Sequence, residues 1–249
     1  MTRVAIIAAM PGELKPLVRG WEHERRNGVD RWRWRFDQGE WIAACAGAGV
    51  DAATRAFAEA ERDGTVDLAI STGWAGALSE KHAVGQAYKV CGAIDARTGE
   101  RFDVAGDAFE REAVPLQNEP WLVTSPRVAG EAEKKRLAAA YGAGLVDMEA
   151  VAIARLAAMR GIPFDCCKGV SDGVGDNLPD FNRFISPDGQ LRMGRLLLFC
   201  ILRPWYWPAL IRMGENSNKA AQAIRGSLLE ILDGSGAIRK RNGYPNRKR

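Results

Sequence analysis

The chain has 249 residues, of which 47% are hydrophobic and 27% charged, a composition typical of a soluble globular protein and long enough for one large α/β domain. Five cysteines without paired spacing and only two histidines exclude a zinc-type ligand cluster, and we expect no metal or organic cofactor. The apolar stretch at the N-terminus is too short for a signal peptide, so we expect a cytoplasmic protein.

The positive charge is concentrated at the C-terminus. The net charge is +4, but residues 239–249 hold six basic residues and no acid, which leaves −2 on the rest of the chain. The body offers no basic face or reading motif for nucleic acid, so we expect no nucleic-acid partner. We expect 236–249 to be a disordered, solubilising tail, with contact to an anionic membrane surface as the alternative.

Apolar runs of strand length alternate with helical patterns along residues 1–235. In residues 31–36, Trp32, Trp34 and Phe36 alternate with arginines, which predicts a half-buried strand whose aromatic face belongs to the core. The predicted strands are Val4–Met10, a hairpin of residues 31–36 and 41–46, residues 66–78 ending in a glycine turn, and residues 88–94, 121–125, 144–148 and 162–170.

Helices and one long loop are expected between these strands. The predicted helical segments are Glu13–Arg19, a helix after the glycine turn in 46–61, turns after Ala132, Glu149–Arg160 ended by Gly161, and most of the remainder. Residues 95–120 are polar and aperiodic, which predicts a long loop with room for a lid. We therefore expect a single three-layer α/β/α domain with a central mixed, mostly parallel sheet.

A glycine motif at residues 47–52, GAGVDA, imitates a dinucleotide-binding fingerprint. Its context differs, because it follows a hairpin strand and the next strand ends at Ser71-Thr72-Gly73 without an acidic residue for a ribose. We interpret it as a tight turn that lets a helix N-terminus approach a ligand.

Three carboxylates follow predicted strands: Glu13, Glu149 and Asp172. Ligands of open α/β sheets bind beyond the carboxyl ends of the strands. Taken singly, each residue also suits a structural role, at a helix N-terminus or in a turn. Together they suit cleavage of an N-glycosidic bond, which needs an acid at the leaving base and a group that activates the nucleophile.

Several motifs resemble the purine nucleoside phosphorylase/uridine phosphorylase superfamily, and most closely its methylthioadenosine/S-adenosylhomocysteine nucleosidases. VDMEAVAIA and KGVSDGVGD are similar to the family's VEMEAxAIA and ISD segments at about the same interval, and IIAAMPGEL, AGAGVDAA and STGWAGAL match in the same order from about Val4 to Asp176. The resemblance implies a nucleoside phosphorylase-like fold and, commonly, a homodimer.

The resemblance also implies roles for individual residues. Glu13 matches the carboxylate that activates water, and Asp172, supported by Ser171, matches the acid that protonates N7 of the purine. Met148 and Glu149 match the pair that packs on the ribose and holds its hydroxyls. Asp147, which replaces a glutamate of the family, is expected only to position its neighbours.

The chain also departs from the family pattern. Trp74, beside Gly73, replaces a small residue in the wall near the nucleoside, and the segment that supplies a base-stacking aromatic reads TSPRV, placing Val128 near the base. The phosphate-binding loop and arginine of the true phosphorylases are missing. Because Glu13 would repel phosphate, we expect water as the nucleophile.

An apolar, tryptophan-bearing segment at 191–214 is flanked by arginines. It suits either a buried helix with an aromatic turn, or a surface for a membrane or a lipid tail. Its R-x-x-x-x-P-A-L-I-R pattern resembles the hopanoid-biosynthesis branch, whose members are assigned to releasing adenine from adenosylhopane.

We therefore predict a nucleosidase that releases adenine from a 5′-substituted adenosine, with adenosylhopane as the favoured substrate and possible attachment to the inner membrane face. The alternatives are phosphorolysis to a ribose 1-phosphate, methylthioadenosine/S-adenosylhomocysteine nucleosidase activity, and a catalytically silent nucleoside-binding regulator.

Overall fold

A computed structural model gives the fold and describes residues 2–37, 39–104, 119–176, 180–186, 189, 192, 199, 202 and 207–234. The tail predicted at 236–249 and the possible lid within 105–118 lie outside these residues. Most of the apolar segment before Trp207 also lies outside them.

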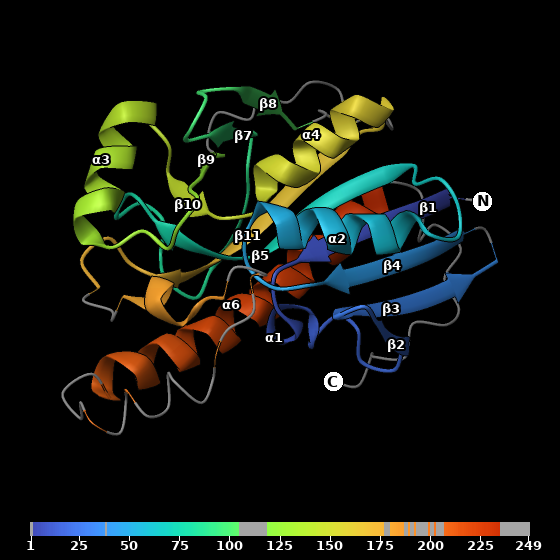
Figure 1. The fold of residues 1–249 in the computed structure, drawn as a ribbon, viewed down its shortest axis with the longest axis horizontal. Coiled ribbons are helices and arrows are strands. Elements are labelled where there is room, and N and C mark those ends of the chain that lie inside the picture. Colours follow the sequence, from blue (N-terminus) through green and yellow to red (C-terminus); the bar gives the residue numbers. More distant parts are fainter. Residues whose placement is uncertain are drawn as a thin grey trace.

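The described strands form one mixed sheet of eleven members (Figure 1). Their bounds are β1 Thr2–Ala8, β2 Glu22–Arg26, β3 Val29–Phe36, β4 Gly39–Cys45, β5 Leu68–Ala77, β6 Ala87–Lys89, β7 Gly92–Asp95, β8 Arg101–Asp103, β9 Trp121–Thr124, β10 Leu145–Asp147 and β11 Phe164–Asp172. The order is β2-β3-β4-β1-β5-β10-β9-β7-β8, and β11 pairs with both β5 and β6.

Strand β5 organises this sheet because it pairs with three neighbours. It runs parallel to β1 along its first half and parallel to β11 along most of its length, and it meets β10 antiparallel at Gly76 and Ala77. The carboxyl end of β1 therefore lies beside the middle of β5, and the short strand β10 lies beside the carboxyl end of β5.

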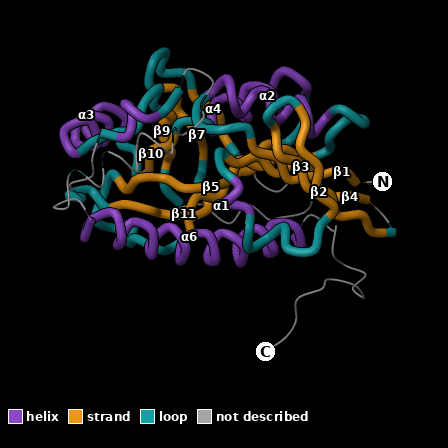
Figure 2. The backbone as a smooth tube through the Cα atoms, turned by 60° about the horizontal axis from the view of Figure 1, so that its bottom comes forward, coloured by secondary structure: helices purple, strands orange, loops and turns teal. Residues whose placement is uncertain are grey.

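Helices cover both faces of the sheet, as the sequence predicts. Figure 2 shows α2, α3 and α4 on one side of the strands and α1 and α6 on the other. The bounds are α1 Pro11–Leu14, α2 Val50–Glu61, α3 Glu131–Tyr141, α4 Ala150–Arg160 and α6 Trp207–Gly234, with a short 3₁₀ helix, η1, at Phe181–Phe184. Among the described residues, no helix combines the length and hydropathy needed to cross a bilayer.

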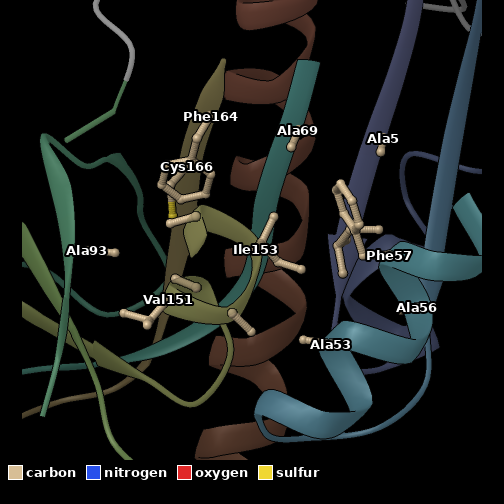
Figure 3. Close-up of a cluster of buried hydrophobic side chains, with 14 of the residues drawn as sticks. Ala5, Ala53, Ala56, Phe57, Ala69, Ala93, Val151, Ile153, Phe164 and Cys166 are labelled. Atoms are coloured by element: carbon tan, nitrogen blue, oxygen red, sulfur yellow. The ribbon is translucent and has the colours of Figure 1, made fainter. Parts of the chain in front are cut away.

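Each face of the sheet has its own apolar core. Ala5 of β1 lies near the fully buried Phe57 of α2 (Figure 3). Ile7 of β1 belongs to the same buried cluster, which also includes side chains of α4. Val4 and Ile6 face the opposite way, toward α1 and α6. This alternation follows from the period of two along a strand that is buried on both faces.

The sequence predictions need four corrections. β5 lies within the strand predicted at 66–78, but it runs through Ser71-Thr72-Gly73, where the strand after the glycine motif is expected to end. The single strand predicted at 88–94 is two strands, β6 and β7, and the loop predicted for 95–120 contains β8. The arginine face of β3 is not simply solvated: Arg31 is 2% exposed because it pairs with Glu24 and Asp63. The hairpin β3–β4 and the packing of its aromatic face on the core are confirmed.

Candidate active site

A cavity of about 280 Å³ opens where β1, β5, β10 and β11 meet. It brings together seven of the eight residues singled out in the sequence, namely Glu13, Trp74, Val128, Met148, Glu149, Ser171 and Asp172. Gly73, the eighth, lies behind the carboxylate of Glu13, where a Cβ would be 2.8 Å from Oε1. With a φ of +116°, this position is strained for any residue with a side chain.

Glu13 is held by backbone N–H groups from two sides. Its Oε2 accepts hydrogen bonds from the N–H of Ala9 at 2.8 Å and of Met10 at 2.7 Å, and its Oε1 accepts one from the N–H of Trp74 at 2.8 Å. The side chain is buried, and this burial raises the pKa of Glu13, although the three donors and Lys168 act in the opposite direction. A carboxyl group with a raised pKa is better matched to taking up a proton near neutral pH.

Glu149 stands at the start of α4 and reaches the glycine turn before α2. Its Oε1 accepts a hydrogen bond from the N–H of Gly49 at 2.7 Å, and its Oε2 accepts one from the N–H of Met148 at 3.2 Å. Burial, reinforced by the nearby charge of Asp147, raises the pKa of Glu149 to about 8. The glycine motif at 47–52 therefore places an N–H on this carboxylate.

A buried ion pair lies beside Glu149. The Nζ of Lys168 on β11 is 2.9 Å from Oδ2 of Asp147 and donates to the carbonyl of Thr72 at 2.9 Å. Asp147 also accepts hydrogen bonds from the hydroxyl of Thr124 and the N–H of Ala150. Burial is the largest single influence on Lys168 and lowers its pKa, but the charge and hydrogen bond of Asp147, together with Cys166 and Glu149, outweigh burial and raise the pKa above its usual value.

Asp172 ends β11 at the opposite side of the cavity. Its Oδ1 accepts a hydrogen bond from the hydroxyl of Ser171 at 2.6 Å, and its Oδ2 pairs with the ammonium of Lys134 from α3. The same ammonium donates to the carbonyl of Gly173 at 2.6 Å. The carboxylate at this end of the cavity is thus accompanied by a cation that our sequence analysis does not include.

The remaining walls are largely apolar. The indole of Trp74 donates to the carbonyl of Ser217 at 3.0 Å and so links β5 to α6. Asn182 of η1 bonds to both the N–H and the carbonyl of Val128, which fixes the loop before α3. Further lining comes from Leu210 and Met213, which belong to the apolar segment singled out at 191–214, and from Arg127, Phe181 and Ile185, which the sequence does not mark.

Two lysines of the site, Lys168 and Lys134, are also absent from the sequence predictions, and they differ in whether a sequence pattern could have identified them. Lys168 stands between the apolar pairs Cys166-Cys167 and Gly169-Val170, and a lone cation among apolar neighbours indicates a buried ion pair. Lys134 stands in the polar run EAEKKR and cannot be told from its exposed neighbours by sequence alone. Within the described part of the chain, no group of three or more His, Cys, Asp and Glu side chains is arranged to hold a metal ion.

Solved structures with the same fold include nucleosidases and a hydrolase. A mutant of the 5′-methylthioadenosine/S-adenosylhomocysteine nucleosidase of Helicobacter pylori, with 5′-methylthioadenosine in its active site, has a TM-score of 0.69 at 15% identity, covering 94% of this chain and 99% of that one. The S-adenosylhomocysteine nucleosidase of Streptococcus pyogenes, in complex with 5-methylthiotubericidin, has a TM-score of 0.65 at 19% identity, covering 93% and 96%. The futalosine hydrolase of Helicobacter pylori has a TM-score of 0.67 at 16% identity, covering 93% and 97%.

At these identities the likeness establishes a nucleoside phosphorylase-like fold. A comparison with curated proteins finds no match. The family model of the phosphorylase superfamily matches residues 3–126 and 87–201. These two stretches together cover most of the sequence, and the protein therefore belongs to the phosphorylase superfamily.

Proposed function

We propose that the protein cleaves the N-glycosidic bond of a 5′-substituted adenosine and releases adenine. The observation that carries this proposal is the meeting of three carboxylates, Glu13, Glu149 and Asp172, in one cavity of about 280 Å³. Each is held by fixed donors, so the groups are oriented before a ligand binds. The nucleosidase structures that share the fold support the choice of a nucleoside substrate.

In the proposed reaction, each carboxylate has a separate task. Glu13 takes a proton from the water that attacks C1′ of the ribose, and Asp172 delivers a proton to the departing base. Glu149 binds the ribose hydroxyls and, when ionised, stabilises the positive charge that develops on the sugar. Met148, next to it on the cavity wall, packs against the sugar.

Water is the nucleophile that the site favours over phosphate. When they are ionised, the two buried carboxyl groups of Glu13 and Glu149 would repel an anion near C1′. Lys134 is one of the cations on the cavity wall, but its charge is already balanced by Asp172, so it is a poor partner for phosphate. Arg127 also lines the cavity and is the residue that would support phosphorolysis as the alternative.

The apolar walls of the cavity favour a substrate whose 5′ substituent is apolar. Leu210 and Met213 of α6, with Phe181 and Ile185, give the cavity an apolar side. A long hydrocarbon would gain roughly 25 cal/mol for each Å² of apolar surface removed from water there. We propose an apolar 5′ substituent, with adenosylhopane as the specific candidate on the strength of the motif that contains Leu210. Thioethers such as methylthioadenosine are the competing candidates.

The substrate preference can be tested at Leu210. We expect the wild-type protein to process a long-chain 5′-alkyl adenosine with a higher kcat/KM than methylthioadenosine. Leu210→Asn should lower kcat/KM for the long-chain substrate by about 10-fold or more, because a polar group then faces the chain. Ile211→Asn, on the exposed side of the same helix, is the matched control. Equal effects of Leu210→Asn on both substrates would contradict an apolar 5′ subsite.

Replacement of Asp172 tests the acid. Asp172→Asn keeps the shape of the side chain but cannot deliver a proton, so we expect adenine release to fall about 10²- to 10⁴-fold. The measurement is the initial rate of adenine formation, with the exposed Asp103→Asn as the control. An unchanged rate in Asp172→Asn would remove this residue from the mechanism.

The nucleophile is identified by the sugar product. We expect the rate of adenine release to be the same with and without phosphate, and the sugar to appear as the free pentose. Chromatography of the products distinguishes this sugar from a ribose 1-phosphate. A strict requirement for phosphate would show that the reaction is phosphorolysis.

The pH dependence follows from Glu149. Burial, Asp147 and Glu13 raise its pKa to about 8, although Lys168 and the Gly49 N–H act in the opposite direction. Because the ionised form stabilises the charge on the sugar, we expect kcat/KM to rise as the pH increases through about 8.

The raised pKa of Glu149 also affects the stability of the folded protein. Because the folded pKa lies above the reference value of 4.5, the contribution of Glu149 to the free energy of unfolding is fully present below pH 4.5 and is lost as the pH rises through about 8.

Urea unfolding of the ligand-free protein between pH 5 and 8 measures this contribution. In the wild type, the free energy of unfolding should decrease as the pH rises, and Glu149→Gln should make this decrease less steep by at most ~1.4 kcal/mol per pH unit. Identical slopes for the wild type and Glu149→Gln would show that Glu149 does not titrate in this range.

A further inference from the structure

Lys134 is a buried cation on a helix, α3, whose other charged residues are exposed or half-buried. Its side chain is 3% exposed, whereas that of Lys135, the next residue on α3, is 65% exposed and pairs with Glu131 one turn away. Taking an ammonium group out of water costs several kcal/mol unless it is paired. The long side chain of Lys134 instead reaches the cavity wall beside Asp172 and Gly173.

Both carboxylate oxygens of Asp172 already accept a hydrogen bond. Oδ1 accepts from the hydroxyl of Ser171, and Oδ2 accepts from the ammonium of Lys134. The protons nearest to this carboxylate are therefore those of the Ser171 hydroxyl and the Lys134 ammonium, and of these two groups only the ammonium is positively charged.

We propose that Lys134 is the source of the proton that Asp172 passes to the departing base, so that the pair, and not Asp172 alone, is the acid of the reaction. This inference rests on the proposed function and adds a residue to it. An ammonium has three N–H groups, of which two have acceptors here, Asp172 and the Gly173 carbonyl. The proton shared with Asp172 has a short path to a base bound against that carboxylate.

The proton balance of the proposed step closes without another reactant. The C1′–N9 bond breaks and its electron pair goes to the base, which receives a proton from Asp172 while Lys134 transfers one to Asp172. Water forms the new C1′–O bond and loses a proton to Glu13. Glu13 then releases this proton to solvent and Lys134 takes one up, so the products are the neutral base and the pentose.

Lys134 acts through Asp172, so it is a positioning and proton-supplying residue, and its test has to separate proton supply from charge alone. Lys134→Met removes both, whereas Lys134→Arg retains a cation that does not give up its proton. A leaving group that departs as an anion needs no proton. A 4-nitrophenyl riboside with the same 5′ substituent therefore bypasses the acid.

The experiment compares adenine release and 4-nitrophenolate release by the full-length wild type, Lys134→Met, Lys134→Arg and the control Lys135→Met. We expect both Lys134 variants to lose about 10²-fold or more in kcat for adenine release, with much smaller losses for 4-nitrophenolate. Lys135→Met should match the wild type on both substrates. Lys134→Met combined with Asp172→Asn should be no slower than Asp172→Asn alone, because the two residues act as a unit.

Three results would overturn the inference while leaving the proposed function intact. They are a wild-type rate of adenine release in Lys134→Arg, equal losses on both leaving groups, and additive losses in the double variant. Lys134→Met leaves the carboxylate of Asp172 without its cation, and a variant that does not unfold cooperatively cannot be compared with the wild type. In that case Lys134→Arg and the double variant, which leave no unpaired carboxylate at this place, provide the comparison of the two leaving groups. Failure of the wild type itself to release adenine would contradict the proposed function, and the inference with it.

Discussion

The ion pair between Lys168 and Asp147 holds together the elements that form the site. Lys168 lies on β11 and Asp147 ends β10, while the bonds of the pair to Thr72 and Thr124 extend to β5 and β9. Removing one partner of such a buried pair leaves an uncompensated charge and costs about 3–5 kcal/mol. The pair thus fixes the position of β10, which leads into Glu149, relative to β11, which ends at Asp172.

Burial of Glu13 and Glu149 imposes a second constraint, because each carboxylate needs donors inside the protein. Both are supplied with backbone N–H groups, and glycines make the approach possible: Gly49 donates directly to Glu149, and Gly73 leaves room for the carboxylate of Glu13. The glycine segments that punctuate the sequence are thus part of the site. Their donors orient both carboxylates, and burial keeps the two pKa values raised, which suits groups that exchange protons or bind hydroxyls.

Much of the fold and the identity of the central carboxylates could be predicted from the sequence, because both depend on local patterns. Alternating side chains identify the hairpin, and acidic residues that follow apolar strands identify Glu13, Glu149 and Asp172. The glycine at position 73 suggests that the strand ends there, whereas pairing with β11 carries β5 on to Ala77, and this pairing is not encoded in the local pattern. Lys134 was missed because its burial depends on where α3 lies relative to β11, a tertiary relationship that the polar run EAEKKR does not encode.

The central claim is that one ligand spans Glu149 and Asp172, with its sugar at the first and its base at the second. The most direct test is a crystal structure of the protein with a C-nucleoside analogue of adenosine, whose glycosidic carbon–carbon bond is not hydrolysed. The account predicts ribose hydroxyls within hydrogen-bond distance of Glu149 and the five-membered ring of the base against Asp172, with Lys134 still paired to that carboxylate. A nucleoside bound elsewhere, or bound with its base at Glu149, would contradict it.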